Sequence, residues 1–129
     1  MSIKIGVVGA SIAGVASSIE LKKLGFNVTL FEESKSISYQ RGAGLMMPIT
    51  LINSLKQRGL VGDSLKYFTM NEFTTFLKKD DGGQRVLTKT DYHDSVTVHW
   101  GNLHAGLDEK FDRIMCLFGK EISEVNNHE

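Results

Sequence analysis

The chain has 129 residues, which is enough for one compact domain with a hydrophobic core. Its 15 basic residues balance 15 acidic residues and form no long run, which argues against a nucleic-acid-binding protein. No apolar run approaches the roughly 18–20 residues of a membrane-spanning helix. The single cysteine excludes an internal disulfide and suits a cytoplasmic protein.

The first 31 residues predict a strand, a helix and a second strand. Residues 3–8 are apolar and rich in β-branched side chains, which is typical of a strand buried on both faces. Residues 12–24 predict a helix that ends at Gly25, and residues 27–31 predict the second strand. The apolar positions of this helix are Ile12, Val15, Ala16, Ile19 and Leu24. Together these elements predict a βαβ unit.

The middle of the chain begins with a glycine-rich tract at residues 41–44, which we expect to be flexible. Pro48 then favours a helix over residues 49–58, because proline suits the first turn, and Gly59 ends it. Residues 72–78 and 85–89 predict a hairpin around the turn at residues 80–83.

The last third predicts a strand at residues 96–98 and then a helix over residues 100–111. Leu103, Leu107 and Phe111 recur at helical spacing and are the expected core positions of this helix. Residues 115–118 and 122–125 predict a final pair of short strands.

The strongest motif is the turn Gly9-Ala10-Ser11-Ile12-Ala13-Gly14 between the first strand and the first helix. Gly9 permits a tight turn, and Gly14 permits the helix to pack closely on the strand. Ser11 replaces the usual second glycine and offers a hydroxyl group to phosphate. The helix N-terminus directs unpaired N–H groups at a pyrophosphate, so we expect Gly9, Ser11, Ile12, Ala13 and Gly14 to bind a dinucleotide.

Glu32 supports this interpretation. It ends the second strand near the expected spacing of about 20 residues, where a carboxylate accepts hydrogen bonds from ribose hydroxyls. The same carboxylate would repel a 2′-phosphate, which disfavours NADP at this site.

A wider pattern then resembles a known family. Phe31-Glu32-Glu33-Ser34, followed by Arg41-Gly42-Ala43-Gly44-Leu45 and Pro48, resembles the flavoprotein hydroxylases of the p-hydroxybenzoate hydroxylase family. The Gly-Ala-Ser-Ile-Ala-Gly variant with a later tryptophan segment looks most like the dihydroxypyridine hydroxylase branch. The resemblance implies that Arg41, Ala43 and Gly44 lie against the ribityl and isoalloxazine portion of FAD.

The resemblance also implies the fold and the activity. It predicts an α/β, Rossmann-like FAD-binding domain with an antiparallel hairpin extension. Residues 1–129 would form a single partial domain, with 72–89 belonging to the start of the substrate-side sheet. In an intact relative, NAD(P)H transiently reduces the flavin, and O₂ supplies the oxygen atom for an electron-rich aromatic or heteroaromatic ring. No protein nucleophile is implied, so no catalytic residue is named.

The chain departs from the family pattern in two respects. Trp100 stands where the family's Arg-x-x-Leu-x-x-x-Leu segment has arginine. Two downstream family motifs, an Asp-Gly and a Gly-Asp segment, do not occur in their usual context, and Asp81-Gly82 and Gly62-Asp63 are interpreted as turns. We therefore expect the chain to be inactive alone.

His93, His99 and His104 fall in three different predicted elements, with no other ligand at a recognised spacing. We therefore expect surface or helix-capping histidines and no metal site.

Three functions remain open from the sequence. The first is the FAD-binding part of a monooxygenase, completed by a second polypeptide or by another copy of the chain. The second is a non-catalytic truncated fragment that acts through self-association or partner binding. The third is a NAD-dependent dehydrogenase domain, against which the tract at residues 41–44 argues.

Overall fold

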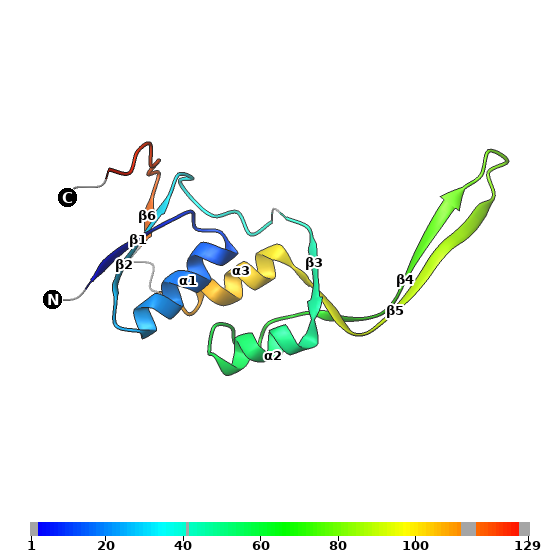
Figure 1. Ribbon diagram of the computed structural model, residues 1–129, viewed down its shortest axis with the longest axis horizontal. Helices are drawn as coiled ribbons and strands as arrows, with labels where there is room; N and C mark the ends of the chain where they lie inside the picture. Colours follow the sequence, from blue (N-terminus) through cyan, green and yellow to red (C-terminus); the bar gives the residue numbers. More distant parts are fainter. Residues whose placement is uncertain (1–2, 41, 112–115, 127–129) are drawn as a thin grey trace.

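The computed structural model describes residues 3–40, 42–111 and 116–126 (Figure 1). The elements in chain order are β1 (Lys4–Val8), α1 (Ile12–Lys23), β2 (Asn27–Glu32), β3 (Gly44–Pro48), α2 (Ile49–Gln57), β4 (Phe68–Lys78), β5 (Gln84–His99), α3 (Trp100–Asp108) and β6 (Cys116–Phe118). They form a parallel sheet in the order β1-β2-β6 and an antiparallel sheet in the order β3-β5-β4. The predicted α/β class is confirmed. None of the helices in the described ranges has the length and apolar character needed to cross a membrane.

The parallel sheet brings the ends of its strands together. Val8 at the end of β1 lies beside Phe31 of β2, and Phe31 lies beside Leu117 of β6. The chain therefore leaves β1 for α1 at the same edge of the sheet where β2 ends at Glu32. Ligands of open parallel sheets bind at this edge.

The prediction that the first strand is buried on both faces is wrong for this structure. Ile5 and Val7 are half-buried, but Lys4, Gly6 and Val8 are exposed, and Val8 is 64% accessible. The physical reason is that α1 packs on one face of the parallel sheet, while the other face stays largely open (Figure 1).

Glycine ends the first two helices as predicted. Gly25 follows α1 at φ +88°, and the N–H of Phe26 donates to the carbonyl of Leu21 at 3.2 Å. Gly59 closes α2 in the same way at φ +66°. This is the backbone geometry of a Schellman cap. Leu24, expected on the buried face, is 73% accessible, because it is the last residue before the cap turns away.

The core lies between the helices and both sheets. Its buried residues are Ala10, Val15, Ile19, Leu30, Ile52, Leu60, Val61, Leu65, Val96, Val98, Leu103, Leu107 and Phe111. The predicted core positions of the last helix are confirmed, although α3 itself ends at Asp108.

Several later elements differ from the prediction. Gly44 belongs to the flexible tract in the prediction but begins β3, which pairs with the C-terminal part of β5. The expected strand at residues 96–98 is part of the long β5, because this stretch lies between β3 and β4. Residues 122–125 form no strand. The predicted hairpin turn is confirmed, with Gly82 at φ +80°.

Candidate functional site

The turn from β1 to α1 is open on its outer side. The N–H of Gly9 donates to the carbonyl of Phe31 at 2.8 Å, which fixes the turn to the end of β2. Gly9 has φ +92°, and a Cβ built on it would have no heavy atom within 4 Å. The turn therefore has the left-handed backbone that favours glycine and leaves room for a ligand over it.

Gly14 lies on the inner side of the same turn. A Cβ at Gly14 would lie 1.8 Å from the carbonyl oxygen of Gly9. No side chain fits there, so the close approach of helix and turn depends on glycine, as the motif predicts.

The N-terminus of α1 presents donors to this space. The N–H of Val15 makes the first helical hydrogen bond to the carbonyl of Ser11, at 3.0 Å. The preceding amides of Ile12, Ala13 and Gly14 thus have no partner within the helix. Ser11 precedes the helix, and its hydroxyl makes no capping hydrogen bond. These donors and the positive end of the helix dipole suit a phosphate.

Glu32 is anchored beside the turn by two backbone donors. Its carboxylate accepts from the N–H of Ala10 at 2.7 Å and from the N–H of Ser34 at 2.9 Å. Burial would raise the pKa of Glu32, but these hydrogen bonds outweigh burial and hold the pKa below its usual value. Glu32 is therefore an ionised acceptor at the end of β2, where the motif places it.

Two cavities meet at Glu32. One, of about 230 Å³, is lined by Ala10, Ser11, Glu32, Ser34, Ser36, Ile37, Ser38 and Trp100. The other, of about 320 Å³, is lined by Val8, Gly9, Phe31, Glu32, Glu33, Lys120, Glu121 and Ile122. Serine residues line much of the first cavity, and both apolar and charged side chains line the second. Together they give a long ligand room on both sides of the carboxylate.

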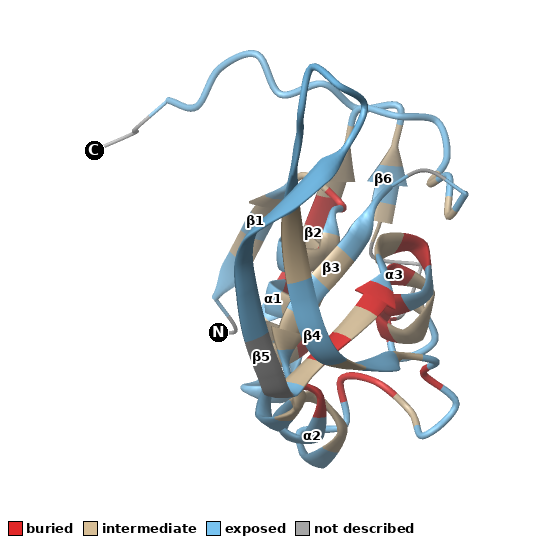
Figure 2. Cartoon of the chain, turned by 90° about the vertical axis from the view of Figure 1, so that its right-hand side faces the viewer, coloured by how far each residue is buried: buried red, intermediate tan, exposed pale blue. Residues whose placement is uncertain are grey.

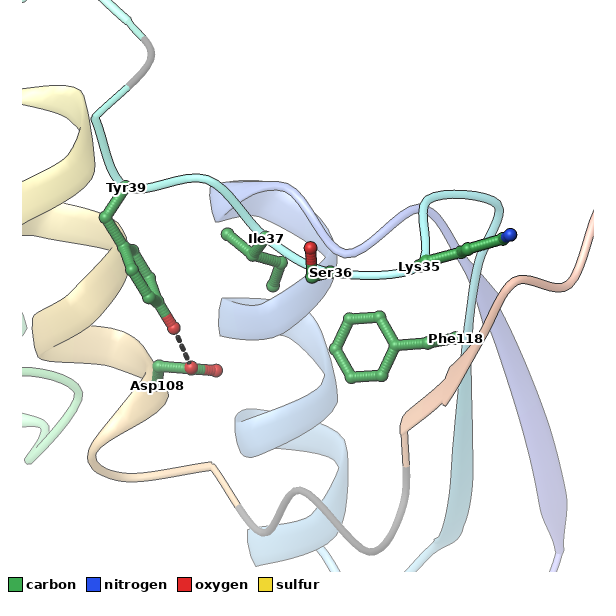
Figure 3. A pocket seen from close by; sticks show the side chains of 6 residues that line it. All are labelled: Lys35, Ser36, Ile37, Tyr39, Asp108 and Phe118. Atoms are coloured by element: carbon green, nitrogen blue, oxygen red, sulfur yellow. Dashed lines mark hydrogen bonds between the residues drawn. The ribbon is translucent and has the colours of Figure 1, made fainter.

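The segment after β2 separates the first of these cavities from a third, of about 240 Å³. Figure 3 shows this third cavity, with Lys35, Ser36 and Ile37 above the ring of Phe118. Tyr39 closes one side, where its hydroxyl donates to the carboxylate of Asp108 on α3. Ser36 and Ile37 line both cavities, so the position of this segment shapes the site at Glu32.

The glycine-rich tract is held against the first turn of α3. The N–H of Trp100 donates to the carbonyl of Ala43 at 3.1 Å, and a Cβ at Gly42 would lie 2.7 Å from Cβ of Trp100. Ala43 is thus next to Trp100, which lines the same cavity as Ser11 and Glu32. Gly44 follows in β3, and Arg41 lies outside the described residues.

The structure therefore brings the predicted residues of the first motif together and places Ala43 next to Trp100, which lines the cavity beside Glu32. The motif residues are Gly9, Ser11, Ile12, Ala13, Gly14 and Glu32.

The burial of one histidine next to the site was not predicted. His99 caps α3 as expected, since its Nδ1 accepts from the N–H of Gly101 at 3.1 Å, and the side chain of His93 lies outside the described residues. His104, expected at the surface or at a helix end, is fully buried. Its position between Leu103 and Leu107 on the apolar face of the helix was the available signal.

No protein-family model matches the chain. The chain is 29% identical to hispidin-3-hydroxylase of Neonothopanus nambi over 103 residues, which cover 80% of this chain and 24% of that protein. It is also 29% identical to 6-hydroxynicotinate 3-monooxygenase of Pseudomonas fluorescens, over 96% of this chain and 34% of that protein. The chain thus spans about a quarter to a third of the length of these curated relatives.

Solved structures show the same fold. 2,6-Dihydroxypyridine-3-hydroxylase from Arthrobacter nicotinovorans superposes with a TM-score of 0.75 at 22% identity, over 99% of this chain and 31% of that chain. CtdE in complex with FAD superposes with a TM-score of 0.73 at 17% identity, over 99% of this chain and 33% of that chain. The predicted resemblance is confirmed, because the relatives and structural neighbours of this chain include FAD-dependent aromatic hydroxylases, and the chain covers a fragment of them.

Proposed function

We propose that the chain is the FAD-binding portion of a NAD(P)H-dependent monooxygenase that hydroxylates an aromatic or heteroaromatic ring. The observation that carries the proposal is the joint position of the Gly9–Gly14 turn, the α1 N-terminus and ionised Glu32 around one pair of cavities. The names of two relatives, hispidin-3-hydroxylase and 6-hydroxynicotinate 3-monooxygenase, support a ring as the substrate class.

Each site residue has a proposed role toward FAD. The open turn at Gly9 and the amides of Ser11, Ile12 and Ala13 would receive the pyrophosphate, and Gly14 keeps the helix close enough to do so. Glu32 would accept hydrogen bonds from ribose hydroxyls. Arg41, Ala43 and Gly44 would face the ribityl and isoalloxazine portion, a role that rests on the family resemblance.

The protein's share of the chemistry is binding and orientation. FAD would supply the redox chemistry, with NAD(P)H as its transient reductant. We propose that the 129-residue chain catalyses little alone, because it spans only 24% and 34% of its two hydroxylase relatives. Residues 1–129 would then be one partial domain of a cytoplasmic enzyme, with the hairpin at residues 72–89 at the start of the substrate-side sheet.

FAD titration tests the proposal. Flavin fluorescence and the emission of Trp100, the single tryptophan of the chain, are recorded as FAD is added. Because Trp100 lines the cavity beside Glu32, we expect saturable quenching of both signals in the micromolar range. NAD serves as the competitor.

Three outcomes are distinguished by this titration. Saturable FAD binding that NAD does not displace supports the proposal. Preferential NAD binding would favour the dehydrogenase alternative. No binding of either dinucleotide at millimolar concentration would overturn both and favour a non-catalytic fragment.

A specific observation supports that last candidate. Apolar side chains lie exposed along the β4–β5 ribbon, which extends away from the rest of the molecule in Figure 1: Phe73, Phe76, Leu77, Val86 and Leu87. A surface of this kind is typical of a contact with another chain. The alternative function is therefore self-association or the binding of a complementing polypeptide.

A further inference from the structure

His104 contacts two segments that border the cavity beside Glu32. Its Nε2 lies 2.7 Å from the carbonyl oxygen of Ala10, in the turn between β1 and α1. Its ring lies edge-on to Tyr39, with centroids 5.7 Å apart, and against Trp100, with centroids 4.9 Å apart. A fully buried side chain of α3 thus contacts both the Gly9–Gly14 turn and Tyr39, which precedes the glycine-rich tract.

The contact with Ala10 determines the tautomer of the ring. A carbonyl oxygen only accepts, so Nε2 of His104 carries the hydrogen and donates it. Nδ1 is then an acceptor, and it has no hydrogen-bond partner among the residues that the structure describes. A leucine would fill similar space without leaving a buried nitrogen unpaired. What histidine adds here is the hydrogen bond to the turn.

The segment that contains Tyr39 is held against α3 by further contacts close to the His104 ring. The hydroxyl of Tyr39 donates to Asp108 one turn further along the helix (Figure 3). A Cβ at Gly101 would lie 1.8 Å from the carbonyl oxygen of Tyr39, so backbone packs directly on backbone at the start of α3. Tyr39 therefore contacts α3 through its carbonyl group, its ring and its hydroxyl group, and the contact of the ring is with His104.

We propose that His104 is a positioning residue that holds the Gly9–Gly14 turn and the backbone at Tyr39 at a fixed separation. It contacts neither cavity and acts through Ala10 and Tyr39. Its consequence for FAD rests on the proposed function. The contacts of His104 with the two segments do not depend on the proposed function, and their effect is measured without any ligand.

The ligand-free experiment compares the wild-type chain with His104→Leu and His104→Gln by amide hydrogen exchange. The reporters are the N–H of Ala10, which donates to Glu32, and the N–H of Trp100, which donates to Ala43. We expect His104→Leu to speed exchange of both by about tenfold relative to amides of β2, since one hydrogen bond is lost locally. Glutamine carries an N–H₂ group that can reach the Ala10 carbonyl, so His104→Gln should restore slow exchange.

Leu107→Ala is the matched control, because Leu107 is a fully buried neighbour of His104 on α3 and its side chain cannot form a hydrogen bond to the turn. It should speed exchange in all elements alike. The proposal is overturned if His104→Leu behaves as Leu107→Ala does, or if His104→Gln behaves as His104→Leu does. The ¹⁵N spectrum of the wild-type ring gives a test that needs no variant. It should show the Nε2-protonated tautomer, and the Nδ1-protonated tautomer would contradict the hydrogen bond to Ala10.

FAD titration of the same variants tests the consequence for binding. We expect about tenfold weaker binding for His104→Leu and near wild-type affinity for His104→Gln and for folded Leu107→Ala. If the wild-type chain binds no FAD, the proposed function fails while hydrogen exchange still decides the role of His104. If FAD binds wild type and His104→Leu equally, and exchange at Ala10 is unchanged, the positioning role is wrong.

Discussion

At the scale of single residues, a substitution at Gly14 tests how tightly the turn is packed. We expect Gly14→Ala to destabilise the chain by about 1–3 kcal/mol, because the new Cβ would meet the backbone oxygen of Gly9 at 1.8 Å and not a movable side chain. Urea unfolding measures this difference. Gly62→Ala is the control, since its Cβ would lie 3.5 Å from Oγ of Ser64, an ordinary contact. Equal losses in both variants would show that the close approach at Gly14 is not the cause.

Glu32 gives a prediction about pH. Hydrogen bonds from Ala10 and Ser34 hold the folded pKa of Glu32 below its usual value of 4.5. The stability that these bonds provide is therefore fully present above the unfolded pKa and is lost as pH falls through the folded pKa. We expect Glu32→Gln to cost about 1 kcal/mol at pH 7 and progressively less below pH of roughly 4.5.

The measurement for Glu32 is urea unfolding at a series of pH values from 7 to 3. Glu33→Gln, which changes the neighbouring exposed carboxylate, controls for the loss of one negative charge. A difference between wild type and Glu32→Gln that stays constant over this range would mean that the carboxylate is not stabilised by its hydrogen bonds.

At the scale of elements, features that depend on neighbouring residues were predicted well, whereas an element that depends on pairing with a distant segment was not. The first βαβ unit, the glycine caps at Gly25 and Gly59 and the hairpin turn each depend on a few neighbouring residues. β3 was missed because its five residues begin with glycine and end with proline, and its strand character comes from pairing with β5, about fifty residues later.

The site divides in the same way. Gly9, Gly14 and Glu32 were predicted because the motif fixes their spacing along the chain. His104 was not, because its partners Ala10 and Tyr39 come from other segments and meet it only in the folded chain. The prediction of a surface or capping role was wrong, although the spacing of His104 with Leu103 and Leu107 fits the apolar face, and no pattern in the sequence indicates what it contacts there.

We expect substitutions in the two halves of β5 to change the free energy of unfolding by different amounts. Val96 is 1% accessible and belongs to the core, whereas Val86 near the ribbon tip is 52% accessible. We expect Val96→Ala to reduce the free energy of unfolding by about 2 kcal/mol and Val86→Ala by less than about 0.5 kcal/mol. Urea unfolding of both variants checks this. Comparable losses would mean that the distal ribbon packs against something in solution.

At the scale of the whole molecule, two apolar surfaces lie open. Val8, Phe31 and Leu117 lie side by side across β1, β2 and β6, on the face of the parallel sheet away from α1. The distal part of the β4–β5 ribbon is exposed along its length in Figure 2. Exposed apolar area of this kind favours association, and a formal net charge of zero does not oppose it.

We therefore expect the chain to self-associate with increasing concentration, as measured by sedimentation velocity. Leu117→Lys places a charge on the open sheet face, and Phe76→Lys places one on the ribbon, so the variant that restores the monomer identifies the surface used. Leu51→Lys is the control, because Leu51 is a comparably exposed apolar residue on α2, away from both surfaces. A wild-type chain that stays monomeric at all concentrations would contradict self-association. If both Leu117→Lys and Phe76→Lys are needed for a monomer, the two surfaces act together, which is what contact with a complementing half of a larger protein would also require.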